Sequence, residues 1–218
     1  TMLNKGFEVI EAMHLYGAAL SQIKVLIHRE SVVHSLVEFA DGAALAQLGV
    51  PSMELPIQLA LTYPERLPCC PPADLAAVGA LHFSEVERGR YPCFFLALGC
   101  AEKGGAYPCI LNAAGEVAVG AFLKGQIKYT QIAEIIEGAL CAGELPYGSY
   151  AALEEADAAA RTRARTSSAR VTAKGAYART TLVFRRHAHR RVGVPRAGHT
   201  ARDGHGARVR ALRRGQTA

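Results

Sequence analysis

Three residues near the start of the chain, Asn4, Lys5 and Glu8, have the types and spacing to bind a phosphate and a metal ion. The amide of Asn4 donates hydrogen bonds, and the ammonium group of Lys5 suits an anionic oxygen. Glu8, about one helical turn later, offers the oxygen ligands that Mg²⁺ or Mn²⁺ prefers. A helix N-terminus also favours phosphate, because its N–H groups are unpaired. The alternative is an ordinary helix with a solvated Lys–Glu pair.

Two other groups of polar residues carry weaker signals. Glu11 and His14 have the i, i+3 spacing of a carboxylate–histidine metal motif, but with a single copy we interpret them as an ordinary helix face. Ser31 and His34 are also three residues apart, and no aspartate is placed to complete a catalytic triad with them. His34 therefore fits a polar residue of a substrate pocket, or a hydrogen-bonded core histidine, better than the partner of a nucleophilic serine.

The composition divides the chain into two parts of opposite charge. Residues 1–160 hold nine Lys and Arg against eighteen Asp and Glu, whereas residues 161–218 hold sixteen against the single Asp203. No run of about 18 apolar residues predicts a membrane helix, and no signal segment heads the chain, so we expect a cytoplasmic protein. The six cysteines form no C-x-x-C pair, which favours reduced, mostly buried thiols over disulfides or a zinc site.

The first 90 residues read as a mixture of helices and short strands. A helix with Asn4 as its N-cap and an apolar face of Phe7, Ile10, Met13 and Tyr16 ends at Gly17. The other predicted elements are strands at 23–28 and 32–39, a hairpin turn at Asp41-Gly42, a helix over 53–68, a proline-rich connector at 68–79 and a last strand in 79–87.

The remainder reads as four helical segments and a basic tail. The helices begin near residues 93, 107, 129 and 149 and are separated by glycine-containing junctions. We predict an α+β fold, with a partial catalytic domain (1–90) holding a small central sheet, followed by a small antiparallel helical domain (91–161). Residues 162–218 have few large apolar residues, so we predict a disordered tail.

Several blocks of sequence, in this order and without large gaps, resemble 1-deoxy-D-xylulose 5-phosphate reductoisomerase. The resemblance covers residues 1 to about 161 and is carried by NKGFEVIEA, IKVLIHRESVVHSLVEFADGAALAQLG, PSMELPIQLALTYPER, YPCFFLA and LNAAGEVAVGAFL. It implies a homodimeric enzyme of the non-mevalonate isoprenoid pathway, with dimer contacts through the central sheet. The implied reaction uses NADPH and Mn²⁺ or Mg²⁺ to convert 1-deoxy-D-xylulose 5-phosphate to 2-C-methyl-D-erythritol 4-phosphate.

The resemblance also implies roles for individual residues. Asn4 and Lys5 match family positions that bind the phosphorylated substrate, and Glu8 matches a metal ligand that also touches substrate. Ser31 and His34 match positions that line or support the pocket, and Met53 matches a loop residue beside the substrate. On this basis we assign catalytic roles to Glu8 and His34.

The sequence also departs from the family pattern. The resemblance implies an NADPH-binding domain and further metal ligands that are absent from these 218 residues, so we expect a fragment that is inactive alone. Gly115 stands where the family has asparagine, which argues against a polar role at that position. For the basic tail we weigh an out-of-frame reading of a GC-rich gene against a nucleic-acid-binding arm, and we favour the former because no RNA-binding signature accompanies the charge. A third alternative is a non-enzymatic module that kept the phosphate site.

Overall fold

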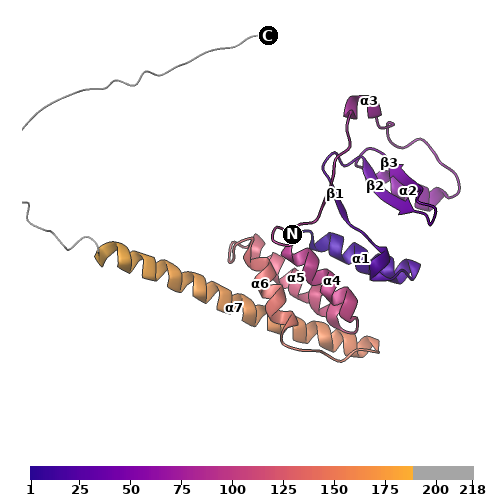
Figure 1. Ribbon diagram of the computed structural model, residues 1–218. Coiled ribbons are helices and arrows are strands. Elements are labelled where there is room, and N and C mark those ends of the chain that lie inside the picture. The colour runs from indigo at the N-terminus through magenta and orange to yellow at the C-terminus, as the bar shows by residue number, and fades with distance from the viewer. Residues whose placement is uncertain (189–218) are drawn as a thin grey trace, which may run out of the picture. The chain divides into compact units, whose positions relative to one another are not determined.

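The computed structural model describes residues 1–188, with side chains described for residues 1–173 (Figure 1). The account below concerns the compact unit Thr1–Lys174. Its elements, in chain order, are α1 (Leu3–Tyr16), a 3₁₀ turn (Leu20–Gln22), β1 (Leu26–His28), β2 (Val33–Glu38), β3 (Ala44–Leu48), α2 (Glu54–Thr62), α3 (Leu75–Val78), β4 (Phe83–Glu85), α4 (Pro92–Lys103), α5 (Tyr107–Leu123), α6 (Gln131–Leu140) and α7 (Tyr150–Ala188), the last of which continues beyond this unit. The predicted α+β class, with helices and a small amount of strand, is confirmed.

Helix α1 packs against α4, and Gly6 determines how closely the two helices approach (Figure 1). A Cβ atom added at Gly6 would overlap the Cβ of Ala97, and it would also meet the carbonyl oxygen of Phe94. The buried face of α1 consists of Leu3, Gly6, Val9 and Ile10. Of the predicted apolar face only Ile10 is fully buried, whereas Phe7 and Met13 are half-buried and Tyr16 is largely exposed. The helix ends at Gly17 (φ +62°), as predicted.

The hydrophobic core lies mainly among α4, α5 and α6, and small residues dominate it. The largest fully buried side chains are those of Ile110, Leu111, Ile132, Ile135 and Ile136, and most of the remaining core residues are alanines. Alanine and glycine let helix axes approach closely, so a modest apolar volume fills the space between these helices. The predicted antiparallel helical region is therefore present, with the start of α1 packed on it.

The strands form two separate two-stranded antiparallel sheets, β1–β4 and β2–β3, and not one central sheet. The β2–β3 hairpin forms where the Asp41-Gly42 signal predicted it, although its loop has three residues, 40–42. The Phe39 N–H donates to the Ala43 carbonyl at 2.8 Å, and the Phe39 carbonyl accepts from the Gly42 N–H at 3.0 Å. Asp41 Oδ1 accepts a hydrogen bond from the backbone N–H of Ala43. Gly42 has φ +88°, which a three-residue loop of this type requires at its last position.

A polar cluster fastens the loop after β1 to the start of β4. His82 Nδ1 donates to Glu30 Oε1 (2.5 Å), and His28 Nδ1 donates to the His82 carbonyl (2.9 Å) and lies 3.0 Å from Glu30 Oε2. The His28 ring is almost fully buried and stacks on Phe83 at 4.6 Å between centroids. The hydrogen bond from His82, assisted by N–H groups of Glu30 and His82, lowers the pKa of Glu30 to about 2.

The last helix corrects the prediction of disorder after residue 161, because α7 continues as a helix to Ala188. Ala156, Ala160 and Ala164 are fully buried, and Val171 extends this stripe into the basic segment. Ser167 lies against Gly138 of α6, so the packing passes the predicted boundary. Alanine and arginine are among the best helix formers, and a small buried face is sufficient in an alanine-rich core. The rest of the predicted tail, 189–218, lies outside the described residues.

Arg161 joins α7 to α5 at the point where the basic segment begins. Its Nε donates to Asp157 Oδ2 at 2.6 Å, and its Nη2 donates to Glu116 Oε2 at 2.8 Å. These two carboxylates raise the pKa of Arg161 above its usual value. Further along α7, Arg163 donates to the Gly143 carbonyl at 2.6 Å. The basic segment is thus docked by polar contacts as well as by its buried alanines.

Two predictions for the middle of the chain need smaller corrections. Helix α2 ends at Thr62, not at residue 68, because the Pro64 that follows cannot extend it and its predecessor is extended. The proline-rich connector contains the short helix α3, capped by Asp74, whose Oδ1 accepts from the Ala77 N–H at 3.0 Å.

No helix in the described part of the chain combines the length and apolar character that a membrane crossing requires.

All six cysteines, which lie in the described part of the chain, are free, as predicted. Only Cys93 and Cys100 are fully buried, whereas Cys69, Cys70 and Cys109 are half-buried and Cys141 is exposed. Burial raises the pKa of the Cys100 thiol to about 11, which makes it unreactive at neutral pH. The prediction of mostly buried thiols therefore holds fully for only two of them.

The Gly6→Ala substitution tests the contact between α1 and α4. The new Cβ has no room beside Ala97, so we expect the free energy of unfolding to fall by about 1–3 kcal/mol despite the better helix propensity of alanine. Gly99→Ala in α4 is the matched control, because nothing lies within 4 Å of a Cβ there, and it should gain about 0.5–1 kcal/mol. Urea unfolding followed by circular dichroism measures both, and equal effects would contradict the assigned contact.

The Glu30 cluster predicts a pH-dependent contribution to stability. Because the pKa of Glu30 is lowered to about 2 from an ordinary 4.5, its carboxylate stabilises the fold above pH 4.5. We expect Glu30→Gln to lower the melting temperature at pH 6 and the deficit to disappear as the pH falls from 4.5 toward 2. Glu65→Gln is the control, since among the described residues its side chain has no hydrogen bond or ion pair. A deficit independent of pH would rule out this role of Glu30.

Candidate functional site

The side chains of Asn4, Lys5 and Glu8 converge at the exposed start of α1. Lys5 Nζ lies 2.5 Å from Glu8 Oε2, and Asn4 Nδ2 donates to Glu8 Oε1 at 3.3 Å. The Lys5 and Glu8 side chains remain 46% and 44% exposed, so a ligand in solution can reach them. Each oxygen of the Glu8 carboxylate thus faces one of the two predicted phosphate-binding residues.

The helix terminus itself differs from the predicted cap. Helix α1 begins at Leu3, one residue before Asn4, which therefore lies inside the first turn and is not the N-cap. Met2 takes the N-cap position in a left-handed conformation (φ 56°), and Thr1 Oγ1 accepts a hydrogen bond from the Leu3 N–H at 3.3 Å. No acceptor in the described part of the chain faces the N–H groups of Asn4 and Lys5. These two donors point toward the positive end of the helix dipole.

The buried face of the first turn of α1 fixes the positions of Asn4, Lys5 and Glu8 on the opposite face. Leu3 and Gly6 are buried, and a Cβ added at Gly115 of α5 would lie 2.9 Å from Leu3 Cδ2. Gly115 therefore meets an apolar side chain. The packing of Leu3 and Gly6 on α5 and α4 directs Asn4, Lys5 and Glu8 toward solvent.

Ser31, His34 and Met53 lie on a different part of the chain. Ser31 precedes β2 and has φ +53°, a left-handed conformation that is unusual for a non-glycine residue. His34, on β2, is exposed and donates from Nε2 to the Gly49 carbonyl at 3.3 Å, and Met53 is 72% exposed at the start of α2. No hydrogen bond or ion pair of the described residues connects these three with Asn4, Lys5 or Glu8.

The cluster of His28, Glu30 and His82 was not predicted as a unit. Within the described residues, His28 Nε2 is the one buried side-chain nitrogen or oxygen without a hydrogen-bond partner. Its other ring nitrogen, Nδ1, is hydrogen-bonded to the His82 carbonyl. Glu30 and His82 are separated by 52 residues, and no spacing in the sequence predicts that they pair.

Comparison with known proteins identifies the family. The model of the DXP reductoisomerase C-terminal domain matches residues 48–163. A 1-deoxy-D-xylulose 5-phosphate reductoisomerase from Geobacillus kaustophilus is 54% identical over 142 residues, which cover 64% of this chain and 37% of the relative. The enzyme of that name from Cupriavidus taiwanensis is 48% identical over 180 residues, which cover 81% of this chain and 44% of the relative.

Solved structures give the same result. The reductoisomerase from Zymomonas mobilis in complex with NADPH is 37% identical and superimposes with a TM-score of 0.73 over 77% of this chain and 45% of that one. A DOX-P reductoisomerase in complex with NADPH, fosmidomycin and magnesium gives 39% identity and a TM-score of 0.72, over 77% of this chain and 44% of that one. The chain spans less than half the length of the relatives described here. It belongs to the 1-deoxy-D-xylulose 5-phosphate reductoisomerase family and contains that family's C-terminal domain.

Proposed function

We propose that the start of α1 is the phosphate- and metal-binding part of a 1-deoxy-D-xylulose 5-phosphate reductoisomerase site. In such a site NADPH and a divalent cation serve the conversion to 2-C-methyl-D-erythritol 4-phosphate. The observation that carries the proposal is the convergence of Asn4 and Lys5 on the Glu8 carboxylate at an exposed helix terminus. Relatives whose structures hold NADPH, fosmidomycin and magnesium support it.

The chain's own groups bind the phosphate of the substrate. The Lys5 ammonium supplies a charge-assisted hydrogen bond, and the Asn4 amide supplies a second donor. The N–H groups of Asn4 and Lys5 add two donors at the positive end of the helix dipole. Because Gly6 and Leu3 hold this turn against α4 and α5, the donors are fixed before the substrate arrives.

Glu8 fits one ligand position for Mg²⁺ or Mn²⁺. Its oxygens are of the type that these cations prefer, and they lie at an exposed position where the cation can keep several waters. When bound, the cation supplies Lewis-acid polarisation of the substrate oxygens. One carboxylate alone holds such a cation weakly, so the proposal requires further ligands from the rest of the enzyme or from the substrate.

Ser31, His34 and Met53 are proposed as pocket residues because of the resemblance to the family. The exposure of His34 and Met53 supports this role, because neither side chain is committed to the core. His34 Nε2–H, which donates to the Gly49 carbonyl, holds the ring in one orientation. His34 would then present its other ring nitrogen to a substrate hydroxyl or to a proton in transfer.

We further propose that the protein works as a cytoplasmic homodimer. The support is the exposed apolar surface of the β2–β3 hairpin, where Leu36, Val37, Phe39 and Leu45 are between 46% and 66% exposed. An apolar surface of this kind favours association with a second chain.

Substitution of Lys5 tests the phosphate site. We expect Lys5→Ala to weaken binding of 1-deoxy-D-xylulose 5-phosphate by about ten- to a hundredfold, because a charge-assisted hydrogen bond is worth about 1.5–3 kcal/mol. Lys24→Ala is the matched control, since Lys24 forms only a long ion pair (3.6 Å) with Glu85 at the surface. Titration calorimetry in the presence of Mn²⁺ measures both variants. An unchanged affinity in Lys5→Ala would contradict the site.

The 218 residues taken alone should not catalyse the reaction. With one carboxylate at the site we expect no NADPH oxidation above background when substrate and Mn²⁺ are supplied, whichever further segments the natural protein has. The positive control is the full-length relative from Geobacillus kaustophilus, assayed spectrophotometrically under the same conditions. Turnover by the isolated chain, abolished by Glu8→Gln, would refute this expectation.

A further inference from the structure

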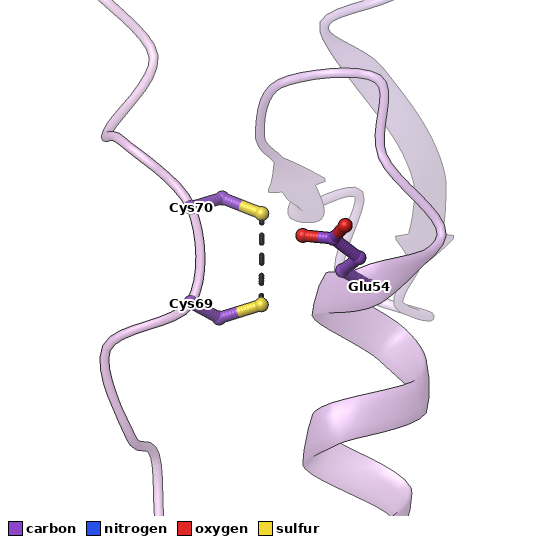
Figure 2. A group of neighbouring side chains, drawn as sticks. All are labelled: Glu54, Cys69 and Cys70. Carbon is purple, nitrogen blue, oxygen red and sulfur yellow. Dashed lines mark hydrogen bonds between the residues drawn. The ribbon is translucent and has the colours of Figure 1, made fainter.

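Two adjacent cysteines and a glutamate meet beside the start of α2. Cys69 and Cys70 are half-buried in the segment between α2 and α3, and Glu54 is the first residue of α2. Figure 2 shows both sulfur atoms on the same side of their segment, facing the Glu54 carboxylate. Pro68 and Pro71 flank the cysteine pair and restrict its backbone, so the two thiols have little freedom to separate.

The distances suit a tetrahedral metal ion. The two Sγ atoms are 3.6 Å apart, and one ligand atom from each of the three residues lies within 4.8 Å of the others. Two sulfurs bound to one tetrahedral Zn²⁺ at about 2.3 Å each lie about 3.8 Å apart. The thiols therefore need to move by only a few tenths of an ångström to share a cation.

The charges of the cluster also suit a cation. Two thiolates and a carboxylate whose ligand atoms lie within 4.8 Å of one another repel each other unless a counter-charge is present. A divalent cation supplies that charge, and its binding releases the thiol protons to solvent.

We propose that Cys69, Cys70 and Glu54 form a binding site for a thiophilic divalent cation of the Zn²⁺ class, with a fourth position open to water. Thiolate ligands select Zn²⁺ and its soft congeners over Mg²⁺, which takes oxygen ligands. The site is therefore separate in chemistry from the proposed Mg²⁺ or Mn²⁺ position at Glu8. The site connects the segment after α2, which carries the cysteines, to the N-terminus of α2, which carries Glu54. Because the cation binds only the folded arrangement, it stabilises this connection.

Cobalt is a suitable probe, because Co²⁺ bound by thiolates gives a charge-transfer band and tetrahedral d–d bands. The reduced full chain, titrated with CoCl₂ without oxygen, should develop these bands at one equivalent, and ZnCl₂ should bleach them. The Cys69→Ser/Cys70→Ser variant should lose the bands, whereas Cys141→Ser should keep them, because Cys141 is exposed and distant in sequence. Glu54→Gln should keep a weaker band, with the affinity for Co²⁺ reduced about tenfold or more.

Two further measurements distinguish loss of the metal site from misfolding of a variant and from oxidation of its thiols. Circular dichroism of each variant should show the helix content of the parent, and a thiol assay should find two fewer reactive thiols when Zn²⁺ is present. Bands that persist in the double serine variant, or that vanish in Cys141→Ser, would overturn the proposal. An unchanged Co²⁺ affinity in Glu54→Gln would also overturn it, because the carboxylate would then not be a ligand.

Discussion

The close approach of α1 to α4 at Gly6 is the contact on which the candidate site depends. The same two helical turns carry Gly6 and Leu3 on the buried face and Asn4, Lys5 and Glu8 on the exposed face. A side chain at position 6 would separate the helices, since a Cβ there overlaps Ala97. It would thereby move Asn4, Lys5 and Glu8 relative to helices α4 and α5. The glycine within N-K-G-x-E thus has a packing role, while binding roles are proposed for the residues around it.

Small residues extend this principle through the helical region. Ala113, Ala114 and Ala118 on α5 are fully buried, as are Ala156 and Ala160 on α7, so these helices meet with little side-chain volume between them. A helix rich in arginine and alanine can pack on such a core, because one buried alanine per helical turn is sufficient to fill the space between the helices. The family match ends at residue 163, yet the buried stripe includes Ala164 and Val171. The prediction of disorder from composition was therefore wrong for this part of α7, because helix propensity and a narrow buried face together stabilise the helix.

The sequence predicted features that depend on neighbours along the chain and missed those that depend on distant ones. The hairpin at Asp41-Gly42 and the end of α1 at Gly17 follow from local turn preferences, and the helices from their periodicity. The start of α1 was missed because Met2 adopts a left-handed conformation and Thr1 supplies the acceptor, in place of Asn4. The pairing of Glu30 with His82 spans 52 residues. Likewise, no metal-ligand spacing indicated that two adjacent cysteines would face a glutamate from another element.

The ion pair between Lys5 and Glu8 bears on how the proposed site would be loaded. With Lys5 Nζ 2.5 Å from Glu8 Oε2, an ammonium already occupies one side of the carboxylate. A divalent cation must compete with this ammonium, whereas a phosphate that draws Lys5 toward itself leaves the carboxylate oxygen free. In the proposed function each ligand therefore removes an obstacle to the other, and by linkage the effect is reciprocal. A pair that stabilises the isolated helix very little, as exposed pairs do, can in this way couple the binding of substrate and metal.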